Sequence, residues 1–408
     1  MKLHSGSPYW LLKHGLVTVV PALQQDETCD VGVIGSGIVG ALIASALVDR
    51  GFDVVILDRR DVAQGSTVAS TALVQYELDV SLTALRGLVE RERADHAYAL
   101  GAGAVGELAG ICRSVGCAAM PRLSVYFTRK RSDLDVLAAE MDARRSMGLE
   151  VEWAGASVLW ERFGLKAAGG IVSRAAAEID PYALTHALWR HCRARGARLY
   201  DRTRVRAVEE TGAGVVLHTA RGPVVRAAYV VHATGYEAAL CLPPGLARLN
   251  TTYAFASEPV GLRGGGDMIW EYAPNYVYAR WDGGRLLAGG LDEPYGLTSP
   301  SECGLEGKTA DLVRTMRELM PALEIEPAYA WCGSFASTAD GLGFICPAAP
   351  GSRRLIALGF GGNGVTLGVI ARRMIVELIV NGFSRDEDLF SLYRTSAAQW
   401  PRPADAGS

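Results

Sequence analysis

The 408-residue chain has little net charge, since 41 lysines and arginines stand against 44 aspartates and glutamates, a balance of −3. Proteins that bind a phosphate backbone carry a clear excess of positive charge, so we expect no nucleic-acid partner. The eight cysteines are scattered without a CxxC pair, and the seven histidines show no metal-binding spacing. We therefore expect no metal site and no disulfide framework, but buried apolar cysteines in a reducing compartment.

Long uncharged apolar runs are also missing. The most apolar helix candidate, residues 364–380, carries Arg372, Arg373 and Glu377, which are costly at a bilayer centre. The apolar stretch at residues 9–23 is interrupted by basic residues and a proline and has no clean signal cleavage site. We expect no membrane span and a cytoplasmic protein. No serine lies in a GxSxG elbow, so the sequence does not support triad hydrolysis.

The composition that remains is that of a globular protein. Hydrophobic residues make up 49% of the chain and 47 residues are glycine, which suits a folded chain with many tight turns rather than a disordered one. A chain of this length exceeds the usual size of one domain, so we expect two.

Hydrophobic patterning predicts the secondary structure. Residues 29–34 and 54–57 read as buried strands, and an apolar helical pattern covers residues 38–50 between them, which makes a βαβ unit and implies a parallel sheet. Residues 251–291 alternate aromatic and β-branched residues with turns, which predicts antiparallel strands with one face toward a pocket. Further helices are expected at 81–115, 132–147, 181–195, 306–319 and 363–380, and further strands at 124–128, within 198–234, at 329–335 and at 354–358.

A glycine-rich motif occupies the turn of that βαβ unit, at residues 35–40. Gly35 allows the tight turn, Gly37 lets a pyrophosphate approach the backbone, and Gly40 lets the helix lie close to the strand. Asp58 ends the second strand, where a carboxylate can accept hydrogen bonds from a ribose diol. This order of elements predicts an adenine dinucleotide but does not separate NAD from FAD.

Three further segments favour a flavin. Residues 65–71 are a run of small hydroxyl residues that can pass close under a ribityl diphosphate, and residues 233–235 end a predicted strand with a threonine and a glycine. The glycine loop at 359–364 opens the last long helix, whose positive end would stabilise negative charge on the N1/C2=O edge of a reduced flavin. Taken alone, each segment could be an ordinary turn.

Together these motifs resemble the D-amino-acid oxidase, glycine oxidase and sarcosine oxidase superfamily over roughly residues 28–385. The resemblance rests on the segments at 35–40, 65–67, 177–181, 233–235, 340–345 and 359–364. The opening at residues 7–10 is also similar to γ-glutamylputrescine-oxidase-like members. Cys332 lies one residue from the position that attaches flavin covalently in the sarcosine oxidase branch, and such a shift on a strand reverses its face, so we expect noncovalent FAD.

The resemblance implies an α/β fold. Its parts are an FAD-binding Rossmann-like domain with a parallel sheet and an interleaved α+β substrate domain with a mixed or antiparallel sheet. We assign residues 28–84, 150–240 and 333–400 to the FAD-binding domain and residues 85–149 and 241–332 to the substrate domain. By the same resemblance, the backbone of Val205 touches the adenine end. The residues expected to bind the cofactor are Gly35, Gly37, Ile38, Val39, Gly40, Asp58, Arg59, Ser66, Thr67, Thr71, Val205, Thr234, Gly235, Gly361, Gly362, Asn363 and Gly364.

The implied activity is oxidation of a small amine or amino-acid-like substrate, by hydride transfer from the C–H next to nitrogen to flavin N5, giving an imine. The electron acceptor is oxygen or a quinone- or dye-like compound, and the oligomeric state stays open. Leu287 lies near the position where sarcosine-oxidase-like enzymes carry an oxygen-activating lysine, which favours a dehydrogenase. Alternatives are a 2-hydroxy acid dehydrogenase and a flavoprotein with structural or sensor FAD; the C-terminal glycine loop argues against an NAD(P) dehydrogenase.

The substrate side departs from the family pattern. Phe335 falls where glycine-oxidase-like enzymes place an arginine for the substrate carboxylate, so the carboxylate is either absent or held elsewhere. Arg280, at the end of a predicted strand, is either an alternative anion clamp or a solvated strand-end residue. We expect Tyr276, Tyr278 and Arg280 to form the substrate wall. Gln75, with the two residues after it, lines the edge of the ring or is a polar turn.

Overall fold

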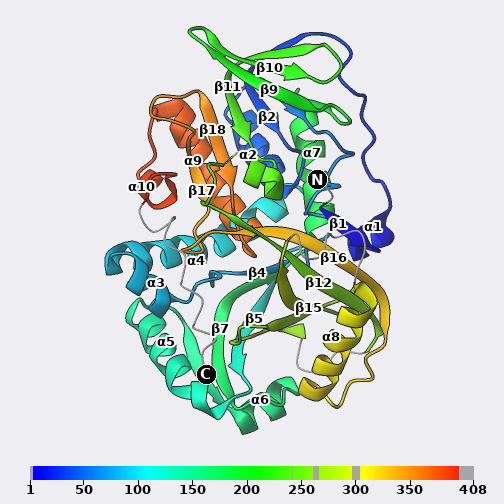
Figure 1. The fold of residues 1–408 in the computed structure, drawn as a ribbon, viewed down its shortest axis with the longest axis vertical. Helices are drawn as coiled ribbons and strands as arrows, with labels where there is room; N and C mark the ends of the chain where they lie inside the picture. Colours follow the sequence, from blue (N-terminus) through cyan, green and yellow to red (C-terminus); the bar gives the residue numbers. More distant parts are fainter. Residues whose placement is uncertain (1–2, 241, 261–265, 296–303, 395–408) are drawn as a thin grey trace.

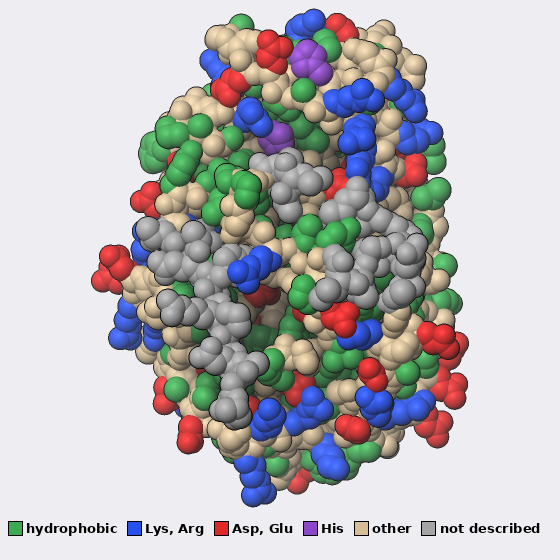
Figure 2. Space-filling view, viewed as in Figure 1, with side chains coloured by type: hydrophobic (Ala, Val, Ile, Leu, Met, Phe, Trp, Pro, Cys, Tyr) green, Lys and Arg blue, Asp and Glu red, His purple; other side chains and the backbone are tan. Residues whose placement is uncertain are grey.

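The computed structural model describes residues 3–240, 242–260, 266–295 and 304–394, which form two sheets covered by helices (Figure 1). The described helices include none that is long and apolar enough to cross a membrane. Figure 2 shows acidic and basic side chains interspersed over the visible face.

The smaller sheet contains the predicted βαβ unit. Its eight strands run in the order β17-β18-β11-β2-β3-β8, with β10 paired to β11 and β9 paired to β10. β2 pairs in parallel with both β3 and β11, as the βαβ pattern requires. The strands are β2 (Glu27–Ile34), β3 (Val54–Leu57), β8 (Arg198–Tyr200), β9 (Val205–Thr211), β10 (Gly214–Thr219), β11 (Val224–His232), β17 (Phe344–Pro347) and β18 (Arg354–Leu358).

Three helices pack together beside this sheet: α2 (Ile38–Asp49), α7 (Pro181–Ala194) and α9 (Gly364–Asn381). α2 is buried along nearly its whole length because it lies against both other helices, which explains its almost uninterrupted apolar sequence. α7 begins at an Asp180 cap, whose side chain accepts a hydrogen bond from the Ala183 N–H, with proline as its first residue.

The larger sheet is mixed. Its strands run β1-β16-β12-β15-β14-β13-β5-β7-β4, with β6 paired to β7, and only the β13–β5 pairing is parallel among the described strands. The antiparallel strands predicted within residues 251–291 form its central part. The strands are β1 (His4–Gly6), β4 (Leu73–Gln75), β5 (Met120–Thr128), β6 (Val151–Gly155), β7 (Gly169–Glu178), β12 (Arg248–Pro259), β13 (Met268–Glu271), β14 (Val277–Asp282), β15 (Arg285–Pro294) and β16 (Pro327–Ser337).

The remaining helices lie mainly around the larger sheet. The long helix predicted at 81–115 is two helices, because Val89 adopts an extended conformation between them. These helices are α1 (Tyr9–His14), α3 (Leu82–Leu88), α4 (Arg91–Ser114), α5 (Leu134–Ser146), α6 (Ala156–Phe163), α8 (Leu305–Leu319) and α10 (Glu387–Phe390), with 3₁₀ turns at Arg131–Asp133 and Gly235–Leu240.

The two-sheet α/β fold predicted from the sequence is confirmed, but the domain boundaries differ. The predicted FAD-binding domain included residues 150–240, whereas β6 and β7 pair within the larger sheet. β4 and the end of β16 also belong to that sheet, although the predicted boundaries placed them in the other domain. β7 is rich in glycine and alanine, which have little β-propensity, so its sequence gave little sign of a strand.

Candidate functional site

A cavity of about 1010 Å³ is lined by residues from both sheets. At the smaller sheet its walls come from the ends of β2, β3, β11 and β18, and at the larger sheet from β14, β16 and the segment after β4. The carboxyl ends of parallel strands are where ligands bind in folds of this kind. The structure places these predicted residues in the wall: Gly35, Gly37, Ile38, Val39, Asp58, Arg59, Ser66, Thr67, Thr71, Gln75, Val205, Thr234, Gly235, Tyr276, Tyr278, Gly361, Gly362, Asn363 and Gly364.

The first glycine loop has no room for a side chain at Gly35 or Gly40. Gly35 has φ of +116°, and a Cβ on it would lie 2.2 Å from the Ala233 carbonyl oxygen. A Cβ on Gly40 would lie 2.1 Å from the Gly35 carbonyl oxygen, so this glycine allows α2 to pack against the loop rather than lining the cavity itself. The loop therefore presents backbone N–H groups at the N-terminus of α2, an arrangement that binds phosphate.

Asp58 lies beside this loop at the end of β3. Its Oδ2 accepts hydrogen bonds from both the backbone N–H and the hydroxyl of Ser36, each at 2.7 Å. Its Oδ1 accepts the Arg60 N–H at 2.9 Å. The carboxylate is thus fixed in the cavity wall, where its remaining lone pairs can accept hydrogen bonds from ribose hydroxyls.

The hydroxyl loop at 65–71 crosses under the N-terminus of α2. Thr67 Oγ1 accepts the Ile38 N–H at 3.0 Å. The buried hydroxyls of Ser66, Thr234 and Ser334 also line the cavity, and none has a hydrogen-bond partner within the part of the chain that the structure describes. Buried hydroxyls are usually hydrogen-bonded, so a polar ligand lying along this wall would satisfy them.

The second glycine loop, at 359–364, opens α9 toward the same cavity. Asp79 lies against it: Oδ2 accepts the Gly362 N–H and Oδ1 accepts from Asn363 Nδ2, both at 2.9 Å. Removal of the carboxylate from bulk water raises the pKa of Asp79 to about 6, against the opposing effect of the Gly362 hydrogen bond. Asp79 was not among the predicted site residues, because only the fold brings it to this loop.

Aromatic rings form the wall at the larger sheet. Tyr276 and Tyr278 line the cavity with ring centroids 6.0 Å apart, while the alternate residues Val277 and Ala279 are buried on the other face of β14. Phe335 also lines the cavity. Burial raises the pKa of Tyr278 to about 12 and that of Tyr276 well above its usual value. Both phenols are therefore protonated at neutral pH and can donate hydrogen bonds.

A model of the family "FAD dependent oxidoreductase" matches residues 30–378, which cover most of both sheets. The chain belongs to this family. It is an FAD-dependent oxidoreductase, and the family resemblance predicted from its motifs is confirmed.

Among curated proteins, the chain is similar to glycine oxidase of Geobacillus kaustophilus, with 24% identity over 89% of this chain and 95% of that protein. It is also 26% identical to the probable oxidoreductase OrdL of Rhizobium meliloti and 27% identical to the putative Rieske 2Fe-2S iron-sulfur protein YhfW of Bacillus subtilis. The alignments span 53% of OrdL and 38% of YhfW, so this chain matches only part of each.

Solved structures share the fold of this chain. The crystal structure of glycine oxidase from Geobacillus kaustophilus superposes with a TM-score of 0.78 at 22% identity, covering 90% of this chain and 99% of that one. L-proline dehydrogenase from P. horikoshii superposes with a TM-score of 0.79 at 18% identity, covering 92% and 100%.

The cavity residues fit the cofactor of the family. The Gly35 loop and α2 would provide N–H groups for a diphosphate, and Asp58 would provide an acceptor for a ribose. The cavity-lining hydroxyls of Ser66 and Thr234, which have no hydrogen-bond partner among the described residues, would bond to polar groups of the cofactor. The positive N-terminus of α9 opens at the same cavity and would stabilise negative charge on a reduced flavin. These individual assignments remain predictions.

Arg280 does not lie where we predicted. It is fully buried and is absent from the cavity wall. Its Nε donates to the Thr71 carbonyl at 2.7 Å and its Nη2 to the Ile179 carbonyl at 3.0 Å. Trp10 and Trp331 donate in the same way to the Ser70 and Ala69 carbonyls. Three buried side chains thus hold three consecutive carbonyls of the hydroxyl loop, and Arg280 supports this loop instead of facing a ligand.

Cys332 and Leu287 also point away from the site. Cys332 packs in the apolar cluster behind the larger sheet, and its neighbours Gly333 and Ser334 line the cavity instead. Leu287 is fully buried in the main core and does not border the cavity. The position of Cys332 supports the prediction of noncovalent FAD.

Proposed function

We propose that this family member oxidises a small amine at the C–H bond next to nitrogen, yielding an imine that water hydrolyses. The observation that carries the proposal is the aromatic wall of Tyr276, Tyr278 and Phe335 at the larger sheet. Among the described cavity residues, the arginines Arg59, Arg60 and Arg204 border the smaller sheet, and the one lysine, Lys130, is an exposed residue that follows β5. An uncharged ring at position 335 favours an amine over a free α-amino acid.

The chain's own residues orient the substrate and exclude water. Bound FAD would supply the acceptor for the hydride that leaves the substrate carbon. Because Tyr276 and Tyr278 stay protonated, they act as hydrogen-bond donors and an apolar wall rather than as bases. The reacting amine must therefore bind in its neutral form, and rings that exclude water favour that form.

Leu287 and Arg280 bear on the electron acceptor and on the alternative substrate class. The position near which the resemblance places an oxygen-activating lysine holds Leu287, which does not border the cavity, so we infer that a quinone- or dye-like acceptor reoxidises the flavin faster than oxygen does. In the alternative function, oxidation of a 2-hydroxy acid, Arg280 would bind the carboxylate of the substrate. The burial of Arg280 beneath the hydroxyl loop removes that support.

Anaerobic mixing of the purified flavoprotein with amines, N-methyl amines, amino acids and hydroxy acids tests the proposal. We expect loss of the visible flavin absorbance with amines and little change with glycine or a hydroxy acid. Bleaching by a hydroxy acid alone would favour the alternative dehydrogenase. Bleaching by none of the compounds would favour a structural or sensor flavin. Reoxidation by air against a quinone then identifies the acceptor.

A further inference from the structure

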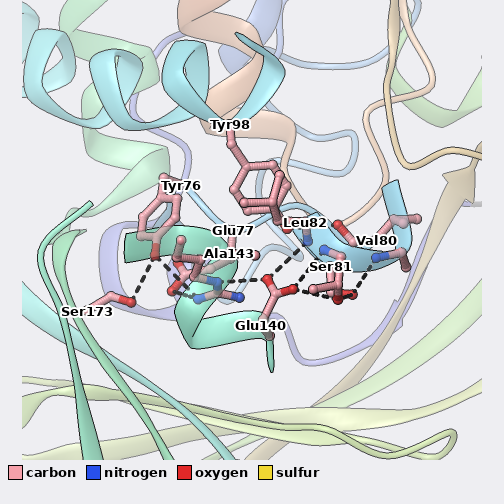
Figure 3. Close-up of polar contacts among 12 residues, drawn as sticks. Tyr76, Glu77, Val80, Ser81, Leu82, Tyr98, Glu140, Ala143 and Ser173 are labelled. Atoms are coloured by element: carbon pink, nitrogen blue, oxygen red, sulfur yellow. Dashed lines mark hydrogen bonds and ion pairs between the residues drawn. The ribbon is translucent and has the colours of Figure 1, made fainter. Parts of the chain in front are cut away.

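A buried ion cluster lies behind the part of the cavity formed by the segment after β4 (Figure 3). Arg144 is completely buried between two carboxylates. Its Nη1 lies 3.1 Å from Glu77 Oε1, and its Nε lies 2.8 Å from Glu140 Oε1. One guanidinium therefore faces two acidic groups, and the cluster carries an excess negative charge when both are ionised.

Glu140 is the fully satisfied member of the cluster. Its Oε1 also accepts the Leu82 N–H at 3.0 Å, and its Oε2 accepts from the N–H and hydroxyl of Thr83 at 2.8 and 2.7 Å. Burial would raise the pKa of Glu140, but Arg144 and Thr83 outweigh burial and hold this pKa below its usual value. Glu140 is ionised and compensates the charge of Arg144.

Glu77 is the under-compensated member. It is 1% exposed and borders the cavity, and its Oε2 has no hydrogen-bond partner among the residues that the structure describes. Burial raises the pKa of Glu77, although Arg144 and hydrogen bonds to the carboxyl group from its own backbone N–H, Ser173 and Ser124 oppose that shift. A buried carboxylate oxygen without a donor is costly, and a cationic ligand in the cavity would supply one.

Aromatic rings border the same part of the cavity. Tyr126 stacks on Trp270 with centroids 3.7 Å apart and meets the edge of Tyr272 at 5.9 Å, and all three line the cavity. Arg144 links these rings to the carboxylate, because its Cζ lies 5.4 Å from the Tyr126 centroid. Arg144 itself does not line the cavity. A carboxylate beside several rings is the environment that binds an alkylammonium group.

We propose that Glu77 Oε2 and these rings bind a protonated nitrogen of the substrate that is distinct from the nitrogen next to the oxidised carbon. This inference rests on the proposed amine oxidation and specifies its substrate class. The reacting nitrogen has to be neutral, whereas a cation beside Glu77 would stabilise the ionised form of this carboxylate, which burial disfavours. A diamine meets both requirements, with one neutral nitrogen at the reacting carbon and one ammonium at the far end.

Three compounds with the same carbon chain test the proposal by isothermal titration calorimetry on the flavin-loaded protein. Diaminobutane ends in an ammonium, butylamine in a methyl group and γ-aminobutyrate in a carboxylate. We expect diaminobutane to bind at least about tenfold more tightly than butylamine, and γ-aminobutyrate to bind most weakly. Equal or tighter binding of butylamine or γ-aminobutyrate would overturn the proposal without any variant.

Two variants test whether Glu77 causes the preference for the diamine. In Glu77→Gln, which keeps the side-chain shape, we expect the Kd for diaminobutane to rise to that for butylamine, while the Kd for butylamine stays unchanged. Glu271→Gln is the matched control, because Glu271 also borders the cavity and is buried but is already paired with Arg129. The control should retain the preference for the diamine. Loss of the preference in Glu271→Gln, or its persistence in Glu77→Gln, would refute the role of Glu77.

The calorimetry also separates this inference from the proposed function. Bleaching of the flavin by butylamine and diaminobutane alike, with equal Kd values, would leave amine oxidation in place and refute the ammonium site. A preference for the diamine that depends on Glu77, without bleaching by any amine, would support the ammonium site and refute amine oxidation.

Discussion

The backbone N–H of Gly362 donates a 2.9 Å hydrogen bond to Asp79 Oδ2, although 283 positions separate the two residues. This contact joins the segment that follows β4 in the larger sheet to the loop that opens α9 beside the smaller sheet. It places a carboxylate at the positive end of an 18-residue helix, inside the cavity that the two sheets share.

The raised pKa of Asp79 predicts a pH dependence of stability. Its pKa of about 6 exceeds the unfolded value of 3.8, so between about pH 4 and about pH 6 the folded state holds a proton that the unfolded state has released. This contribution to stability is present at low pH and is lost as the pH rises through about 6. We expect Asp79→Asn, measured by thermal unfolding without flavin, to gain stability over the native chain across that window. A constant difference across the window would contradict the shift.

Gly40→Ala is expected to disrupt the cofactor loop. The added Cβ would lie 2.1 Å from the Gly35 carbonyl oxygen, so the loop or α2 must move, at a cost of about 1–3 kcal/mol. We expect lower thermal stability and loss of flavin absorbance during purification. Gly103→Ala is the matched helical control, because its Cβ meets nothing within 4 Å, and it should stabilise α4 by roughly 0.5–1 kcal/mol. A yellow, stable Gly40→Ala protein would contradict the role of this glycine.

Arg280→Met is expected to act on the hydroxyl loop rather than on substrate binding. The change leaves the buried Thr71 and Ile179 carbonyls without a donor, which costs roughly 2 kcal/mol, and it loosens the loop under the diphosphate. Stability and flavin retention should fall together. Arg174→Met, at a side chain that is 66% exposed, should change neither. If Arg280→Met instead weakened only the binding of carboxylate ligands, the hypothesis that Arg280 binds an anionic substrate would be supported.

Phe335→Arg is expected to change ligand preference. Phe335 lines the cavity beside Tyr236, where the family resemblance places an arginine for a carboxylate. A guanidinium there can bind a carboxylate bidentately, so the Kd for glycine should fall at least about tenfold and the Kd for butylamine should rise. Isothermal titration calorimetry with glycine and with butylamine measures both Kd values. An unchanged Kd for glycine would show that residue 335 does not face the substrate.

Local sequence patterns predicted the cofactor half of the site. The turn at 35–40, the helix after it and Asp58 follow one another within one βαβ unit, so their geometry depends mainly on neighbours in the chain. The structure places α2 at Ile38–Asp49 and β3 at Val54–Leu57, close to the predicted ranges. The glycine loop before α9 was predicted for the same reason.

Side-chain direction on the larger sheet was harder to predict. Tyr276, Tyr278 and Arg280 have the same parity along β14, and the first two do line the cavity. Arg280 instead donates hydrogen bonds to the carbonyls of Thr71 in the hydroxyl loop and of Ile179. No pattern within β14 indicates that these segments, which come from elsewhere in the chain, cover this end of the strand.

The sequence by itself determined the family, the cofactor class and the backbone turns that are predicted to hold a dinucleotide, because those turns require glycine at fixed spacing. Only the tertiary structure decided which charges meet: Asp79 with the Gly362 loop, Glu77 with Arg144, and Arg280 with the carbonyls of the hydroxyl loop. Each of these contacts joins segments that are distant in sequence. Their energies depend on burial and on the donors supplied by other elements, which a linear pattern does not contain.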